Sequence, residues 1–121
     1  MNQVILTVDD SRTMRDMLRL ALVKAGFNVV EAVDGAHGLE VLADITPHVI
    51  ITDINMPNLD GFGFIEAVRD DEHHRATPIL VLTTESDQEK KDRARKAGAT
   101  GWIVKPFNPD KLVEAIRRVA A

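Results

Sequence analysis

Short apolar runs alternate with segments of helical period along the whole chain. Five of these runs have the length of a β-strand: Val4–Val8, Asn28–Ala32, Val49–Thr52, Ile79–Thr83 and Trp102–Val104. Three are almost wholly apolar and β-branched, which is typical of strands covered on both faces in a parallel sheet. The run at Asn28–Ala32 is more polar, so we expect it to lie at an edge of the sheet.

The segment after the first run predicts the clearest helix. Its apolar residues recur at steps of three and four and form one stripe, as in an amphipathic helix. The members of this stripe are Met14, Met17, Leu18, Ala21, Leu22 and Ala25. Ser11 is the expected N-cap, and Gly26 is expected to end the helix.

Three later segments also predict helices with an apolar stripe. They begin after Asp34-Gly35, near Asp60, and at Pro109 or Asp110, where proline suits the first turn of a helix. The residues expected to be buried are Leu39 and Leu42 in the first, Ile65 and Val68 in the second, and Leu112, Ile116 and Val119 in the third.

The segment from Ser86 to Lys96 differs from the others, because Ala94 is its only apolar residue. Its basic side chains are Lys90, Lys91, Arg93, Arg95 and Lys96. Little apolar burial holds such a helix, so we expect it to be among the least stable elements and a candidate moving part. The pattern fits a simple solvated surface helix equally well.

The alternation of strands and helices predicts an α/β fold. Right-handed crossovers between parallel strands place helices on both faces of the sheet, which gives a single doubly wound (βα)5 domain. The 121 residues suffice for one such domain and not for two. We therefore expect one domain over residues 1–121, with no output domain after the last helix.

Composition argues against several classes of protein. The net charge of −4 disfavours a nucleic-acid binder that relies on overall charge, although a local basic patch stays open. The chain has no cysteine, so disulfides, a thiol nucleophile and zinc–thiolate sites are excluded. The apolar runs are too short to span a membrane, and the first residues lack the regions of a signal peptide. We expect a cytoplasmic location.

Charged side chains follow three of the predicted strands, at the point where each strand ends. Asp9 and Asp10 follow the first run, Asp53 the third, and Lys105 the last. Because ligand sites in open α/β sheets lie at the carboxyl edge, we expect these side chains to meet there. Carboxylate oxygens suit Mg²⁺, and an ammonium group suits a phosphoryl oxygen. The combination suggests that Asp53 is a covalent nucleophile that forms an aspartyl-phosphate.

Further residues at the same edge fit this chemistry. The backbone carbonyl of Asn55 is a candidate ligand for the same ion, and a hydroxyl of Thr83 or Thr84, at the end of the fourth run, is a candidate partner for a phosphoryl oxygen. The Lys105-Pro106 bond can be cis, in a tight turn that redirects the lysine.

Each of these features has a simpler interpretation when it is taken alone. Asp10 or Ser11 can cap the following helix, and an aspartate before a turn-rich loop is common turn chemistry. Threonines at strand ends follow from β-propensity, and a strand-end lysine is more often exposed. The prediction of a site depends on all of them falling at one edge of one sheet.

The chain has four histidines, His37, His48, His73 and His74. None shows ligand spacing with the carboxylates, and the adjacent pair His73-His74 follows an acidic segment that is expected to be a solvated loop. We therefore interpret all four as surface residues.

The order and spacing of the strand-end residues resemble the receiver domain of two-component response regulators, over essentially the whole chain. The matching motifs are Val8-Asp9-Asp10-Ser11, Thr52-Asp53-Ile54-Asn55-Met56-Pro57, Asp60-Gly61, Leu82-Thr83-Thr84 and Val104-Lys105-Pro106-Phe107. This family has a flavodoxin-like parallel sheet with strand order 2-1-3-4-5, and we expect that order here from the resemblance.

The resemblance implies a role for each residue of the site. Asp53 would accept a phosphoryl group from a histidine kinase. Mg²⁺ would be held by Asp9, Asp10, Asp53 and the carbonyl of Asn55. Lys105 would contact the phosphoryl group, and Thr83 would be the switch hydroxyl that moves toward it. The result is a phosphorylation-activated switch whose only chemistry is its own phosphorylation and dephosphorylation.

Within this family the chain looks most like the stand-alone chemotaxis regulators of the CheY type. Asn55 two residues after Asp53, and Glu85 two residues after Thr83, match the pattern that goes with a short-lived aspartyl-phosphate. The implied partner surface comprises the fourth helix, the fifth strand and the fifth helix. The implied partners are a histidine kinase, a target such as a component of the flagellar motor switch, and a candidate phosphatase. We expect a monomer that binds neither nucleic acid nor membrane.

The chain departs from the family pattern at two positions. Trp102 falls where the family has an aromatic switch that swings inward, usually tyrosine or phenylalanine. Thr84 replaces the small residue that usually follows the switch threonine. Both positions are candidates for tuning to a particular partner. A phosphate sink and a single-domain receiver of a developmental or stress pathway remain alternatives to a chemotaxis role.

Two other classes of protein use similar features and fit less well. Aspartyl-phosphate phosphatases also have a nucleophilic aspartate at a strand end. They need a second acid two residues later, where this chain has Asn55, and a substrate cap for which it has no room. A nucleotide-binding module needs a glycine-rich loop after the first strand, whereas Asp9-Asp10-Ser11-Arg12 is acidic there.

Overall fold

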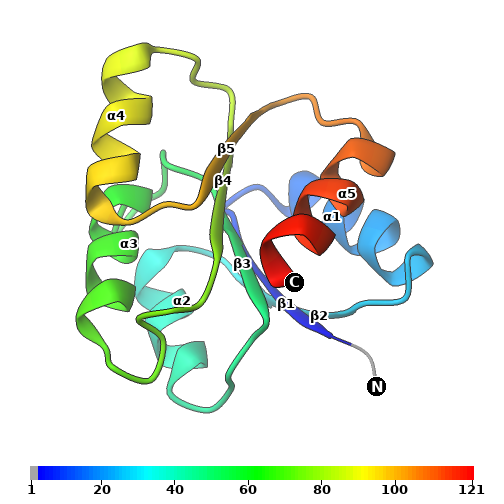
Figure 1. Cartoon of the computed structure of the whole chain (residues 1–121), viewed down its shortest axis with the longest axis horizontal. Coiled ribbons are helices and arrows are strands. Elements are labelled where there is room, and N and C mark those ends of the chain that lie inside the picture. The colour runs from blue at the N-terminus through cyan, green and yellow to red at the C-terminus, as the bar shows by residue number, and fades with distance from the viewer. Residues whose placement is uncertain (1–2) are drawn as a thin grey trace.

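The computed structural model describes residues 3–121, in which strands and helices alternate along the chain (Figure 1). The strands are β1 (Val4–Val8), β2 (Asn28–Ala32), β3 (Val49–Thr52), β4 (Ile79–Thr83) and β5 (Gly101–Val104). All pair in parallel, in the order β2-β1-β3-β4-β5. The predicted α/β fold and strand order are confirmed, and Asn28–Ala32 does form an edge strand.

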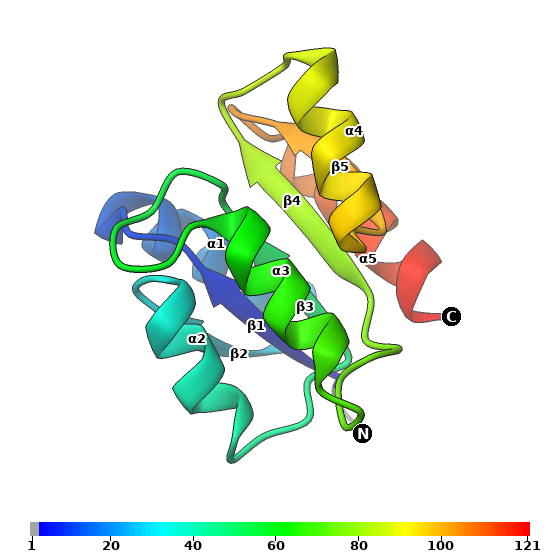
Figure 2. The same ribbon diagram turned by 90° about the vertical axis from the view of Figure 1, so that its left-hand side faces the viewer.

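Helices cover both faces of this sheet. On one face lie α1 (Arg12–Lys24) and α5 (Pro109–Ala120), and on the other lie α2 (Gly35–Leu42), α3 (Gly61–Asp70) and α4 (Gln88–Ala97) (Figures 1 and 2). Each layer of helices encloses its own apolar cluster against the sheet. The three central strands are therefore buried on both faces, which explains their apolar sequences. No helix within residues 3–121 combines the length and the apolar character needed to cross a membrane.

Short polar side chains begin each helix. The N-cap residues are Ser11, Asp34, Asp60, Asp87 and Asn108, and each accepts a backbone N–H from the first turn. Gly26 follows α1 with a φ of +97°, in the left-handed region that favours glycine, so the predicted end of this helix is confirmed.

The predicted buried faces are largely correct. In α1, Leu18 and Leu22 are fully enclosed, and α3 and α5 bury Ile65, Val68, Leu112 and Ile116. Met17, in contrast, is 47% exposed, so its place in the buried stripe of α1 was wrong. The stripe in the sequence is wider than the surface that the sheet offers, and Met17 lies on the side of the helix that turns away.

Helix α4 is held by few apolar contacts, as its sequence predicts. Ala94 is its only buried residue. The guanidinium of Arg93 lies 4.1 Å from the ring centroid of Phe62 in α3. At the C-terminal end of α4, Arg69 Nε donates a hydrogen bond of 3.0 Å to the carbonyl of Gly98. These contacts anchor the second half of α4 to α3.

The prediction that all four histidines lie at the surface is wrong for His74. Its ring is only 4% exposed, and Nε2 lies 2.9 Å from the carbonyl oxygen of Leu42 at the end of α2. The turn after α3 packs against this helix end, where the last carbonyl groups have no partner within the helix. His73 is exposed, and no histidine joins a cluster of candidate metal ligands within residues 3–121.

Candidate functional site

The carboxyl ends of β1 and β3 bring three carboxylates together. Oxygen atoms of Asp9, Asp10 and Asp53 all lie within 4.8 Å of one another. The backbone places two of them, because the N–H of Asp53 donates to the carbonyl of Val8 and the N–H of Asp9 donates to that of Ala32. These bonds continue the parallel ladder beyond the strand ends. The backbone at Asp9 and at Asp53 is therefore fixed by the ladders that join β1 to β2 and to β3.

Lys105, which follows β5, reaches into this acidic cluster. Its Nζ lies 2.8 Å from Oδ2 of Asp53 and 2.9 Å from Oδ2 of Asp9. The lysine side chain is 10% exposed, so the alternative of a solvated strand-end lysine does not hold. The Lys105-Pro106 peptide bond is cis, as the sequence allowed.

Burial and pairing set the protonation of these groups. Burial raises the pKa of Asp9, against the opposing hydrogen bonds from the Ser11 N–H and from Lys105. Burial alone would lower the pKa of Lys105, but its bonds to Asp53 and Asp9 more than reverse this effect and the pKa is raised. Lys105 is therefore held in its charged form. One ammonium group cannot neutralise three carboxylates, so the cluster retains an excess of negative charge.

The donor set of the cluster fits a magnesium ion. Oδ1 of Asp9 accepts the Ser11 N–H, and Oδ1 of Asp53 accepts the Ile54 N–H. A carboxylate oxygen has two lone pairs, so each of these atoms keeps capacity for a second partner. Asp10 is exposed beside them. Hard oxygen ligands with uncompensated charge are what Mg²⁺ prefers.

Glycine is required where the loop after β3 enters α3. A side chain at Gly61 would collide with the carbonyl of Asp53 and with the backbone of Ile54. The N–H of Gly61 donates to the carbonyl of Ile54 at 2.8 Å. This close approach folds the loop back on itself and fixes the backbone that carries Asp53.

Arg15 is a contributor that the sequence interpretation missed. Its Nη1 donates a hydrogen bond of 2.6 Å to the carbonyl of Asp9, and its Nε lies 3.5 Å from Glu31 on β2. The arginine therefore ties the turn that carries the two acids to α1 and to the edge strand. The available signal was a basic residue one turn into the helix that follows an acidic pair.

Thr83, Thr84 and Asn55 lie at the same edge of the sheet, where the neighbouring strands β3 and β4 end. Thr83, the last residue of β4, is buried, and its Oγ1 accepts the N–H of Glu85 at 3.3 Å. Thr84 lies outside the strand and is exposed, and β4 ends at Thr83 as the sequence predicts. Asn55 is exposed, and its Nδ2 donates to Oε1 of Glu85 at 3.1 Å.

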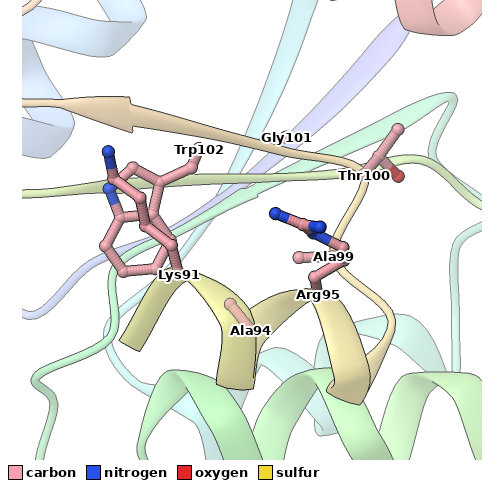
Figure 3. Close-up of a pocket in the computed structure, with 7 residues that line it drawn as sticks. All are labelled: Lys91, Ala94, Arg95, Ala99, Thr100, Gly101 and Trp102. Atoms are coloured by element: carbon pink, nitrogen blue, oxygen red, sulfur yellow. The ribbon is translucent and has the colours of Figure 1, made fainter. Parts of the chain in front are cut away.

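Trp102 lies on β5, next to α4. Its Nε1 donates a hydrogen bond of 3.0 Å to the carbonyl of Glu85. Between α4 and β5 a cleft of about 250 Å³ opens (Figure 3). It is lined by Lys91, Ala94, Arg95, Ala99, Thr100, Gly101 and Trp102. The cleft combines an aromatic wall, a floor of small residues and two basic side chains.

Comparison with known proteins gives consistent matches. A family model described as the response regulator receiver domain matches residues 5–117. The chemotaxis protein CheY1 of Helicobacter pylori is 39% identical over 117 residues, which cover 95% of this chain and 94% of that protein. The solved structure of the chemotaxis protein CheY4 of Vibrio cholerae is 44% identical with a TM-score of 0.94, and the match covers 98% of this chain and 99% of that chain.

A further solved structure bears on the acidic cluster. The receiver domain of the sensor histidine kinase PA1611 from Pseudomonas aeruginosa was solved with a magnesium ion coordinated in its active-site cleft. It is 26% identical to this chain with a TM-score of 0.92, and the match covers 99% of this chain and 98% of that one.

Proposed function

The chain belongs to the response regulator receiver family, and from this premise we propose that it is a phosphorylation-activated switch whose phosphoacceptor is Asp53. Receiver domains are signalling switches rather than classical enzymes, and they work with histidine kinases and downstream targets. The observation that carries the residue assignment is the position of Lys105, which joins Asp53 to Asp9 within the acidic cluster.

Asp53 would act as the nucleophile. A carboxylate oxygen of Asp53 attacks the phosphorus of a phosphohistidine, an O–P bond forms, and the N–P bond breaks as the imidazole nitrogen leaves with its electron pair. The product is a mixed anhydride, which water hydrolyses back to carboxylate and phosphate. A magnesium ion at the cluster would neutralise charge on the transferring group. Asp9, Asp10, Asp53 and the carbonyl of Asn55 are the residues that would hold it.

Two neighbours would respond to the phosphoryl group. Lys105 already contacts the carboxylate of Asp53, so its ammonium group is in place to bind a phosphoryl oxygen on that carboxylate. Thr83 would turn its hydroxyl toward the same group and give up the N–H of Glu85. The phosphate would then bias a two-state equilibrium of the loop after β4, of Trp102 and of α4.

A role in chemotaxis extends this proposal. The relatives from Helicobacter pylori and Vibrio cholerae are named chemotaxis proteins, and the matches span nearly all of both chains. The partner surface would be formed by α4, β5 and α5, and it would include the cleft beside Trp102 (Figure 3). A single receiver over residues 1–121, a monomeric state and a cytoplasmic location are part of the same proposal.

Intact mass spectrometry after incubation with acetyl phosphate and Mg²⁺ tests the phosphoacceptor. We expect a labile gain of one phosphoryl group that is absent without Mg²⁺ and absent in Asp53→Asn. Asp44→Asn, which changes an exposed aspartate outside the cluster, serves as the matched control and should label normally. An adduct that persists in Asp53→Asn contradicts the assignment. If the wild type shows no adduct and also fails to bind beryllofluoride, the proposed function is wrong.

A further inference from the structure

Glu85 lies between the candidate site and α4. Its Oε1 accepts a hydrogen bond of 3.1 Å from Nδ2 of Asn55 and lies 3.0 Å from Nζ of Lys90. Asn55 belongs to the loop that follows the proposed phosphoacceptor strand β3, and Lys90 belongs to the first turns of α4. One carboxylate oxygen therefore links the two elements.

The backbone of Glu85 is held independently of its side chain. Its N–H donates to Oγ1 of Thr83, and its carbonyl accepts Nε1 of Trp102. Because the N–H and the carbonyl of Glu85 both have a partner, its main chain is fixed, and only the direction of its side chain remains free. The two polar partners, Asn55 and Lys90, decide that direction.

The charges of the pair support this arrangement. Hydrogen bonds from Lys90 and then from Asn55 lower the pKa of Glu85, so its carboxylate is charged. The side chain of Glu85 is 29% exposed and that of Lys90 is 40% exposed, which leaves both within reach of a partner protein. A partly exposed carboxylate without its cation would lose side-chain order and its fixed direction toward Asn55.

The position of Lys90 on α4 gives the contact its importance. Arg93 and Arg69 anchor the second half of this helix, through Phe62 and through the carbonyl of Gly98. The first half has no buried apolar residue, because Ala94 is the only buried residue of α4. Within residues 3–121, Glu85 is the only acidic residue that forms an ion pair with Lys90.

We propose that Lys90 is a positioning residue of the candidate site, which directs the carboxylate of Glu85 onto the amide of Asn55 and thereby couples α4 to the acidic cluster. The inference rests on the proposed function, because the coupling would link α4 to the site that the proposed function assigns to Mg²⁺ and the phosphoryl group. An acidic group of a partner that binds Lys90 would release Glu85 and alter the surroundings of Asn55. Binding of this partner would then change the affinity of the acidic cluster for Mg²⁺. Because coupling is reciprocal, binding of Mg²⁺ would change the affinity for the partner by the same factor.

The first experiment measures the contact itself. The side-chain amide resonances of Asn55 are compared by NMR in the wild type, Lys90→Gln and Lys96→Gln. Lys96 is an exposed lysine at the other end of the same helix, so its substitution removes the same charge. We expect the Asn55 amide to shift in Lys90→Gln, to stay in place in Lys96→Gln, and to return toward the wild-type position in Lys90→Arg. This readout does not depend on phosphorylation.

The second experiment measures the coupling as a Mg²⁺ affinity, by titration calorimetry. In Lys90→Gln the charge of Glu85 is no longer neutralised beside the cluster, so Mg²⁺ should bind about two- to fivefold more tightly, the range expected for a partly exposed ion pair. In a Glu85→Gln background the same substitution should have little further effect. Thermal unfolding of each variant verifies that it is folded.

The outcomes separate the inference from the proposed function. An unchanged Asn55 amide in Lys90→Gln, or an equal change in Lys96→Gln, overturns the inference. A gain in Mg²⁺ affinity that persists in the Glu85→Gln background also overturns it, because the effect is then simple removal of a nearby positive charge. Failure of the wild type to accept a phosphoryl group at Asp53 counts against the proposed function and leaves the NMR result standing.

Discussion

The ammonium group of Lys105 lies 2.8 Å from the carboxylate of Asp53, although 52 residues separate the two along the chain. The same group contacts Asp9, which is 96 residues away. The ends of β1, β3 and β5 are thus joined by one side chain. The contact neutralises part of the charge that the acidic cluster would otherwise leave unpaired.

Replacement of Lys105 by methionine should destabilise the protein in the absence of divalent ions. The substitution keeps the length of the side chain but leaves two enclosed carboxylates without their cation, at a cost of about 1–3 kcal/mol in the free energy of unfolding. Saturating Mg²⁺ should restore part of this loss. Denaturant unfolding with and without Mg²⁺ measures both effects, and an equal loss in Lys111→Met, an exposed lysine, would contradict the explanation.

Replacement of Asp10 by alanine should weaken Mg²⁺ binding and leave the fold intact. Asp10 is exposed and Ser11 supplies the N-cap of α1, so the substitution removes a candidate ligand without removing a core contact. We expect the affinity for Mg²⁺ to fall about tenfold or more, because divalent affinity follows the charge of the ligands. Calorimetric titration measures this, and wild-type affinity in the variant would remove Asp10 from the ligand set.

Arg15 and Arg19 provide a matched pair on α1. Both contact Glu31, but only Arg15 also donates to the carbonyl of Asp9. Arg15→Lys should therefore weaken Mg²⁺ binding several-fold while it preserves the charge, because the turn that carries Asp9 loses its support. Arg19→Lys should change the affinity little. Equal effects of the two substitutions would mean that the contact with Glu31, rather than with Asp9, is responsible.

The environment of Trp102 should change on activation. It is the only tryptophan of the chain, so intrinsic fluorescence reports this residue alone. Its hydrogen bond to the carbonyl of Glu85 must adjust if the loop after β4 moves toward a phosphoryl group. We expect beryllofluoride with Mg²⁺ to shift the emission in the wild type and not in Asp53→Asn. An unchanged spectrum at saturation would argue against a moving aromatic residue.

The N-cap of α2 should contribute to stability in a pH-dependent way. The His37 N–H and the amide of Asn58 hold the pKa of Asp34 below its ordinary value of 3.8. The carboxylate of Asp34 thus binds a proton less readily in the folded state than in the unfolded state. Its contribution to the free energy of unfolding is therefore complete above the ordinary pKa and is lost as the pH falls through the lower pKa of the folded state. Asp34→Ser keeps a capping oxygen but not the charge. It should be less stable than the wild type at neutral pH, and the difference should shrink below about pH 4, as measured by thermal unfolding.

The sequence alone predicted the strands and helices closely, because their signals are local. The N-cap at Ser11, the start of α3 near Asp60, the end of α1 at Gly26 and the strand at Val49–Thr52 depend on neighbouring residues. Even β5 begins only one residue before its predicted start. The edge of the sheet that carries the acidic cluster also followed from sequence, because the carboxyl ends of parallel strands lie on one side.

Only the tertiary structure decided how individual side chains are used. Met17 and Leu18 are adjacent in one helix, yet the rotation of α1 against the sheet exposes the first and encloses the second. His74 is buried because a loop packs against the end of α2. The link from Asn55 through Glu85 to Lys90 joins three elements. Such contacts depend on the relative position of elements that are distant in the chain, and no local pattern of residues carries that information.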